Sequence, residues 1–344
     1  MRRVLLSCIL AAAACTADGP AGSSAPGAPA ARPDAAVAPR RAPAAAPNAP
    51  VDLTLGSGDD PCAGEIVMRG GQRFLELDDG TLIAMAPMTV TVAGAKDAFH
   101  PDNAAGGALL HRCNAGEVFL PGGTAYEGAA SPATCTGRFE EDAARIESAG
   151  WDDPQTGAIR WHGITAQGSA RISGARVPRV EPVLQADGSG FYVSRTGLQD
   201  TRYAPDDARR FVDSGEVPYA ALRRDQGVPL GTFGVAYRTR GCPYNRDCEP
   251  VPFIVADHAP RAGSGSMALA RAVSGLPPEE PSRENRYDGE ARRQDVLTVF
   301  FGGAPAGAPY TSDAVRERAA EAFEAWGGTE RLSRCRRRYI PEAG

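Results

Sequence analysis

Residues 255–266 read V-A-D-H-A-P-R-A-G-S-G-S, and they place a single carboxylate, Asp257, at the end of an apolar segment. The apolar run is typical of a buried strand, and the glycine–serine turn after it leads into a helical pattern. A carboxyl group in such a position can act as a general acid or a general base. The structural alternative is that Asp257 caps the turn or the helix that begins at Met267. The chemistry therefore depends on whether a second acidic group faces Asp257.

The elements that must position Asp257 are predicted to be mostly short strands. Asp78-Asp79-Gly80 is typical of a tight hairpin turn. Apolar runs and alternating patterns predict strands at 73–77, 81–84, 88–92, 191–196, 219–222, 231–237, 252–256 and 296–301. Helices are predicted at 206–212, at 267–273 after two serines that can cap it, and at 313–326 before Gly327. This mixture indicates a β-rich barrel or an α+β domain.

The N-terminal segment has the pattern of an export signal. A basic start, a short apolar run and small residues at 1–14 predict a signal peptide, and Cys15 stands where a bacterial lipoprotein is lipidated. The alternative is a plain signal peptide with an incidental cysteine. Residues 15–52 are rich in Ala and Pro and predict a disordered tether, so 53–344 should form a single domain. We expect an exported protein, anchored to a membrane through the N-terminal lipid only or otherwise secreted.

The formal charge of −5 gives no basic surface for nucleic acid, and we expect no nucleic-acid partner and a monomeric chain. Six cysteines lie in the predicted domain, which in an exported protein favours three disulfides. Cys242 and Cys248 bracket a short turn-rich loop and are predicted to pair with each other. The pairing of Cys62, Cys113, Cys135 and Cys335 stays open. The competing zinc site lacks a C-x-x-C spacing or paired histidines, so we expect no metal and no cofactor.

Six segments occur in an order that resembles the glycoside hydrolase family 75 chitosanases and their bacterial relatives. Two of them contain M-T-V-T-V-A-G-A-K-D-A-F-H-P-D-N and G-F-Y-V-S-R-T-G-L-Q-D, and a third contains V-A-D-H-A-P-R-A-G-S-G-S-M-A-L-A. The six segments are 88–103, 108–116, 190–200, 211–222, 227–235 and 255–270. The resemblance covers about residues 65–302, and it is interrupted by a divergent region at about 115–179 that can form an insertion. The arginine-rich end with Arg334, Arg336, Arg337 and Arg338 lies outside it and is expected to be a solvated surface or tail.

The resemblance implies a β-barrel core of double-psi type with a few short helices, and hydrolysis of β-1,4 glucosamine linkages with inversion. An inverting reaction needs two carboxyl groups about 6.5–9.5 Å apart, one to protonate the leaving oxygen and one to activate water. Asp257 matches the aspartate of the family's D-x-G-P motif, with Ala259 in place of the glycine. Ser264 stands where the family's G-E-x-S motif carries its glutamate, and the loop between the two motifs is about two residues shorter. A serine hydroxyl cannot supply the proton near neutral pH.

Other acidic residues are candidates for the missing acid. They are Glu249, Asp247, Glu279 and Glu280, which are near in sequence, and Asp97 and Asp102, which could approach in space. Two groups of polar residues are candidates for binding substrate. His100, Asp102 and Asn103 follow a predicted strand, where a structural turn is the alternative, and Tyr192, Ser194 and Thr196 share one face of the predicted strand 191–196.

Two functions follow from this pattern. The first is an exported polysaccharide-acting protein that resembles an inverting chitosanase, with acid catalysis lost or rearranged. The second is a non-catalytic cell-surface lipoprotein that binds glycans. In both cases the expected partner is a polysaccharide, either chitosan-like or a cell-wall glycan.

Overall fold

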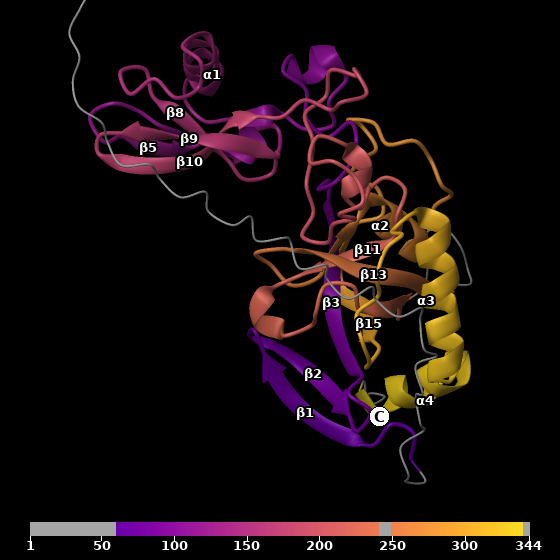
Figure 1. Cartoon of the computed structure of the whole chain (residues 1–344). Helices are drawn as coiled ribbons and strands as arrows, with labels where there is room; N and C mark the ends of the chain where they lie inside the picture. Colours follow the sequence, from indigo (N-terminus) through magenta and orange to yellow (C-terminus); the bar gives the residue numbers. More distant parts are fainter. Residues whose placement is uncertain (1–59, 241–248, 340–344) are drawn as a thin grey trace, which may run out of the picture. The chain divides into compact units, whose positions relative to one another are not determined.

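Six strands pair in a closed ring and form a β-barrel, which is the β-rich core expected from the sequence (Figure 1). The computed structural model describes residues 60–240 and 249–339. In order around the ring the strands are β3 (Leu82–Thr91), β14 (Ser264–Ser266), β11 (Tyr219–Leu222), β13 (Val251–His258), β12 (Phe233–Arg238) and β15 (Ala291–Phe300). The ring closes because β15 pairs with β12 and also with β3.

The barrel has parallel and antiparallel pairs. β11 runs parallel to β13, and β14 runs parallel to β3, whereas the pairs of β11 with β14, β12 with β13 and β12 with β15 are antiparallel. A hairpin of β1 (Gly64–Arg69) and β2 (Gln72–Leu77) extends the sheet beyond β3. The predicted turn 78–80 joins β2 to β3, with Gly80 at a positive φ of 80°, so the predicted hairpin is confirmed.

The described residues contain four α-helices. α2 (Met267–Val273) follows β14 directly, and the side chains of Leu269 and Val273 enter the core inside the barrel. α3 (Ser312–Trp326) packs on β12 and β13 and covers one side of the barrel (Figure 1). α4 (Gly328–Tyr339) follows α3 directly. No helix among the described residues is long and apolar enough to cross a membrane.

The divergent region folds into small elements around a second core. It contains α1 (Phe139–Ser148), and its strands form a three-stranded sheet, a hairpin and a short pair. The strands are β4 (Gly116–Phe119), β5 (Ala125–Glu127), β6 (Ala129–Ser131), β7 (Thr134–Cys135), β8 (Ala158–Trp161), β9 (Ala166–Ile172) and β10 (Ala175–Pro182). Trp161 is fully buried in this core, which also includes Val92 and Met267 from the barrel elements. All described residues belong to one compact unit.

Two predictions from the sequence are wrong, and a third is wrong in part. Residues 191–196 form isolated bridges and no strand, because their main-chain groups pair with different segments in turn: the Tyr192 N–H donates to Phe99, and the Val193 N–H donates to Val183. The predicted helix at 206–212 is only a 3₁₀ turn, Ala208–Arg210, capped by Asp207. The arginine-rich end is α4 and no tail: Arg334 and Arg337 are exposed, as expected for a solvated surface, whereas Leu332, Cys335 and Tyr339 of the same helix are buried.

Two disulfides occur in the described residues, and they indicate an oxidising, exported environment. Cys62 pairs with Cys335 and ties α4 to the segment before β1, and Cys113 pairs with Cys135 in the divergent region. The predicted Cys242–Cys248 pair, the signal segment, Cys15 and the tether lie outside the described residues and stay predictions. Near the first disulfide, Arg331 of α4 forms a buried ion pair with Asp79 at 2.8 Å.

The two disulfides should differ in their contribution to stability. Cys62–Cys335 closes a loop of 273 residues and Cys113–Cys135 one of 22. Because the entropy that a crosslink removes from the unfolded chain grows with loop length, we expect the double variant Cys62→Ser/Cys335→Ser to lose about 2 kcal/mol more unfolding free energy than Cys113→Ser/Cys135→Ser. Guanidinium unfolding of both variants measures the difference. An equal or reversed order would contradict the assignment of the long loop as the main crosslink.

Candidate functional site

Asp257 lies near the carboxyl end of β13, where the pairing with β11 is irregular. Ala220 pairs with Val255 and Ala221 with Asp257, so one extra residue, Ala256, bulges on β13. Bulges of this kind re-aim side chains and are common beside functional sites. The main-chain N–H of Gly197 donates to the Asp257 carboxylate at 2.8 Å, and Leu198 donates to the carbonyl of Ala256 at 2.8 Å. The segment 197–198 therefore holds the end of β13 from outside the barrel ladder.

The environment of Asp257 shifts its titration. Burial raises the pKa of the Asp257 carboxyl above its usual range, and the hydrogen bonds from the main chain of His258 and Gly197 and the charges of His258 and Arg195 oppose that rise. Desolvation thus dominates over the nearby positive charge. A carboxyl group with a raised pKa is suited to proton transfer. The same burial disfavours its charged form in the folded protein.

The structure excludes the proposed capping role for Asp257. The residue that caps α2 is Ser266, whose hydroxyl accepts from the N–H of Leu269 at 3.0 Å. The Asp257 carboxylate bonds to Gly197 instead. One of the two serines predicted as caps is therefore confirmed in that role, and Asp257 has no part in starting the helix.

Asp257 and Ser264 lie in one row across four neighbouring strands. Ala221 pairs with Asp257 on one side and with Ser264 on the other, and Ser264 pairs with Thr89. Directly paired residues point to the same face of a sheet. Two strand spacings of about 4.8 Å place the main chains of Asp257 and Ser264 about 9–10 Å apart. Between them in the row stands Ala221, whose side chain is buried in a core cluster with Val212 and Tyr219.

Ser264 is held in the sheet by a short polar network. Its hydroxyl lies 3.1 Å from the hydroxyl of Thr89, which also lies 3.2 Å from the carbonyl of Gly263. Gly263 has a positive φ of 75°, and a Cβ atom there would meet the carbonyl oxygen of Pro87 at 2.1 Å. The turn before Ser264 thus requires glycine. It fixes the direction from which any side chain at 264 enters the row.

The candidates for a replacement acid do not gather around Asp257. Glu249, Glu279 and Glu280 line a cavity of about 950 Å³ at the start of β13, and the six steps of the chain from Val251 to Asp257 span about 20 Å of strand. Asp97 lies in the electrostatic range of Lys96 and Glu280, and Asp102 is exposed beside His100. Asp247 lies outside the described residues.

His100, Asp102 and Asn103 form the predicted turn. Its side chains bond within the turn and to two other parts of the chain. The Asp102 N–H donates to Nδ1 of His100 at 3.0 Å. Asn103 has a positive φ of 49°. Its side-chain Nδ2 donates to Glu140 of α1 at 3.0 Å, and its side-chain Oδ1 accepts from the main-chain N–H of Arg112 at 2.7 Å. These bonds fix the loop to the divergent region. Its contact with a glycan stays a prediction.

Tyr192, Ser194 and Thr196 are buried. Tyr192 packs beside Trp161, with ring centroids 6.4 Å apart, and Ser194 accepts a hydrogen bond from Gly94 N–H at 2.9 Å. Thr196 accepts from Val212 N–H at 3.1 Å and donates to the carbonyl of Leu198 at 2.8 Å. Ser194 and Thr196 thus position the segment that holds Asp257. The contact of these three residues with substrate stays a prediction.

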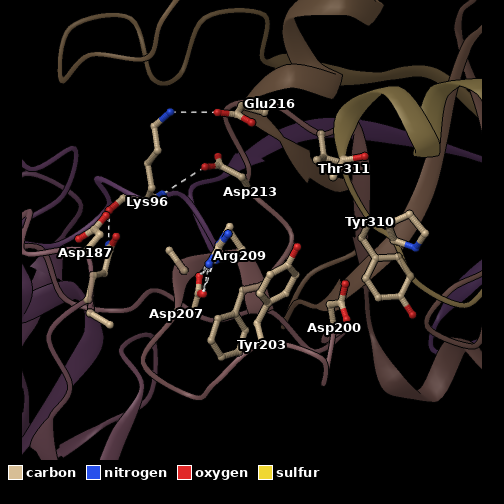
Figure 2. Close-up of a pocket in the computed structure, with 16 residues that line it drawn as sticks. Lys96, Asp187, Asp200, Tyr203, Asp207, Arg209, Asp213, Glu216, Tyr310 and Thr311 are labelled. Carbon is tan, nitrogen blue, oxygen red and sulfur yellow. Dashed lines mark hydrogen bonds and ion pairs between the residues drawn. The ribbon is translucent and has the colours of Figure 1, made fainter.

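A second candidate site, which the sequence did not single out, is an acidic cavity of about 580 Å³ (Figure 2). Its wall includes Asp187, Asp200, Asp207, Asp213 and Glu216 beside the rings of Tyr203 and Tyr310. Burial raises the pKa of the Asp213 carboxyl to about 6, and the charge of Glu216 adds to the rise. Asp257 is not part of this wall. The sequence gives no local signal for this cavity, because its lining residues come from segments far apart in the chain.

Comparison with models of known protein families gives no match for this chain, and comparison with curated proteins gives none. Within residues 60–240 and 249–339, no group of three or more His, Cys, Asp or Glu side chains is arranged to hold a metal ion. The residues described above therefore carry the functional argument themselves.

Replacing Asp257 by asparagine should increase stability at neutral pH. The folded-state pKa of Asp257 lies above the value of about 3.9 that an unfolded aspartate has. The charged form is thus disfavoured by folding, and wild-type stability falls as the pH rises through this window. Asp257→Asn keeps an acceptor for Gly197 and removes the charge. We expect a higher unfolding free energy than wild type at pH 7, and a difference that shrinks as the pH falls through the folded-state pKa of Asp257 towards about 3.9, where the unfolded carboxyl also takes up its proton.

Urea unfolding at several pH values measures this effect. A matched control is Asp225→Asn, because Asp225 is exposed and paired with Arg223, so its pKa is shifted down instead of up. A loss of stability in Asp257→Asn at pH 7 would show that the carboxylate stabilises the fold and is not held there against a desolvation cost.

Proposed function

We propose that this chain is an exported polysaccharide-acting protein that resembles an inverting chitosanase, in which Asp257 keeps the general-base position and acid catalysis has been lost at Ser264. The observation that supports it is the row Thr89–Ser264–Ala221–Asp257. The resemblance pairs Asp257 with Ser264. These residues lie on the same face of the sheet with one strand, β11, between theirs, although they are seven residues apart in the chain. Two carboxyl groups at these positions would lie near the separation of about 6.5–9.5 Å that inversion requires.

The proposed division of roles follows from the chemistry of the two side chains. Asp257, with its raised pKa, can take a proton from an attacking water. A leaving sugar oxygen must receive a proton, and the serine hydroxyl at 264, already bonded to Thr89, is not an acid near neutral pH. Hydrolysis by the natural chain should therefore be weak or absent.

The second candidate is a non-catalytic cell-surface lipoprotein that binds glycans, tethered through Cys15 and residues 15–52. The hydrogen bond from Ser264 to Thr89 favours it, because a polar contact closes the position where an acid would reach the substrate. The disulfides support export in both cases. The two candidates differ only in whether the row can still turn over a bound glycan.

Restoring a carboxyl group at 264 tests the proposal. We expect Ser264→Glu to raise reducing-end release from chitosan by about a hundred- to ten-thousand-fold, the usual contribution of a positioned general acid. Ser264→Gln is the matched control, since it has nearly the same size and no proton to give. Adding two residues before Gly263 in the Ser264→Glu background tests whether the shortened turn misdirects the new side chain, because an error of about 1 Å can cost a hundredfold.

The role of Asp257 is tested in the same assay with Asp257→Asn. In the Ser264→Glu background this change should remove the gained activity. A natural chain that is already active, and loses that activity in Asp257→Asn, would mean that another carboxylate is the acid. Activity that does not depend on Asp257 would reject this site altogether.

A further inference from the structure

The acidic cavity around Asp213 is built from four parts of the chain that fold together. Lys96, residues 185–187, residues between 200 and 217, and residues 309–311 each contribute to its wall. A volume of about 580 Å³ is within the range of small-molecule sites in proteins, roughly 300–1,000 Å³. Five carboxylates and two cationic side chains, Lys96 and Arg209, line it, so the wall favours a positively charged ligand.

Three of the five carboxylates already have a cationic partner. Arg209 binds Asp207 at 2.6 Å, and Arg202 binds Asp200 at 2.6 Å. Lys96, the only lysine of the chain, directs its Nζ to Glu216 at 2.9 Å, as Figure 2 shows. These ion pairs are complete without a ligand, and they leave Asp187 and Asp213.

Asp213 is the half-buried carboxylate of the wall that forms no ion pair, and burial is the main cause of its raised pKa. Its oxygens accept from main-chain N–H groups, from Gly215 at 2.7 Å and from Lys96 at 3.4 Å. It forms no ion pair within the part of the chain that the structure describes, and the amine of Lys96 is engaged by Glu216. A desolvated carboxylate in this state gains strongly from a cation that brings hydrogen-bond donors.

The two tyrosine rings of the wall differ in whether a cationic side chain already covers them. Arg209 lies over the ring of Tyr203 at 4.7 Å, so that ring face is occupied. Among the described residues no arginine or lysine stacks on Tyr310, which lines the cavity together with Phe211, Val217 and Pro309. A ligand beside Asp213 would therefore meet one carboxylate and an apolar wall with a free aromatic ring.

From this arrangement we infer that the cavity binds a protonated primary amine carried on a carbon skeleton, with the ammonium group on Asp213 and the skeleton against Tyr310. The carboxylate accepts the ammonium hydrogen bonds, and the aromatic face stabilises the cation and the carbon atoms next to it. Two sources share this chemistry: an amino-sugar residue of a glycan and a free polyamine. The inference goes beyond the proposed function and does not rest on it, since Asp257 is not in this wall.

Isothermal titration of the purified chain at pH 7 and low salt tests the site. The probes are a β-1,4 glucosamine trimer, its fully N-acetylated and uncharged counterpart, and spermidine. We expect one or both amines to bind and the N-acetylated trimer not to bind. A trimer-only result assigns the site to a glycan and a spermidine-only result to a free polyamine. Absence of binding by both amines, or equal binding of the N-acetylated trimer, would overturn the inference.

Asp213→Asn should weaken amine binding about 10- to 100-fold, because it removes a charge-assisted hydrogen bond from a desolvated place. The matched control is Asp225→Asn, which removes one exposed carboxylate that pairs with Arg223 away from the cavity. It should leave the affinity unchanged. Equal affinity of wild type and Asp213→Asn would overturn the inference, as would an equal loss in the control.

A measurement on wild type alone guards against a misfolded variant. Burial raises the pKa of Asp213 to about 6, and the charge of Glu216 adds to the rise. The hydrogen bond from the Gly215 N–H and the charge of Lys96 oppose it. Spermidine stays charged, so its binding should fall about tenfold for each pH unit below the pKa of Asp213 as the carboxylate takes up a proton. Affinity for spermidine that is the same at pH 7 and pH 5 would contradict the assignment of the ammonium group to Asp213.

Discussion

The hydroxyl of Ser266 joins three elements on which the candidate site depends. It accepts from the N–H of Tyr219 at 3.0 Å and from that of Leu269 at 3.0 Å, and it donates to the carbonyl of Val217 at 2.7 Å. Ser214 acts beside it: its hydroxyl accepts from Met267 N–H and donates to the carbonyl of Thr91. Both serines are fully buried, so no water can replace these bonds without disrupting the core. They set where β14 lies between β3 and β11, and so where Ser264 enters the row.

The same hydrogen bonds fix the main-chain position of residue 264, whichever side chain stands there. The row needs β14 between β3 and β11, and β13 beside β11, and these pairings are held by the barrel and by buried hydroxyls. The identity of residue 264 has little effect on that framework, because the one side-chain hydrogen bond of Ser264 within residues 60–240 and 249–339 is to the hydroxyl of Thr89. A carboxyl group can therefore be exchanged for a hydroxyl at little cost to the fold. Under the proposed function, this exchange removes the group that would supply a proton to the leaving sugar oxygen.

The sequence predicted the parts of the fold that depend on local patterns. Strands β11, β12, β13 and β15, the hairpin at 78–80, helix α2 with its Ser266 cap and helix α3 before Gly327 all follow from apolar periodicity and turn chemistry. Residues 191–196 also alternate, yet their main chain bonds to several different segments, so isolated bridges form there and no strand ladder. Helix α4 was missed because its many arginines hide three buried positions, one of them Cys335, whose partner Cys62 is near the other end of the domain. The acidic cavity was missed for a similar reason: Lys96, Asp213 and Tyr310 come together only in the folded chain.

We propose that a glycan lies across the row from Asp257 to Ser264 with one carboxyl group in reach. A crystal structure of the chain with a β-1,4 glucosamine oligosaccharide tests it most directly. We expect a glycosidic bond between the side chains of Asp257 and Ser264, and no second carboxyl group within about 9.5 Å of Asp257. An oligosaccharide bound away from this row, or a second carboxylate facing Asp257 across the bond, would contradict the account.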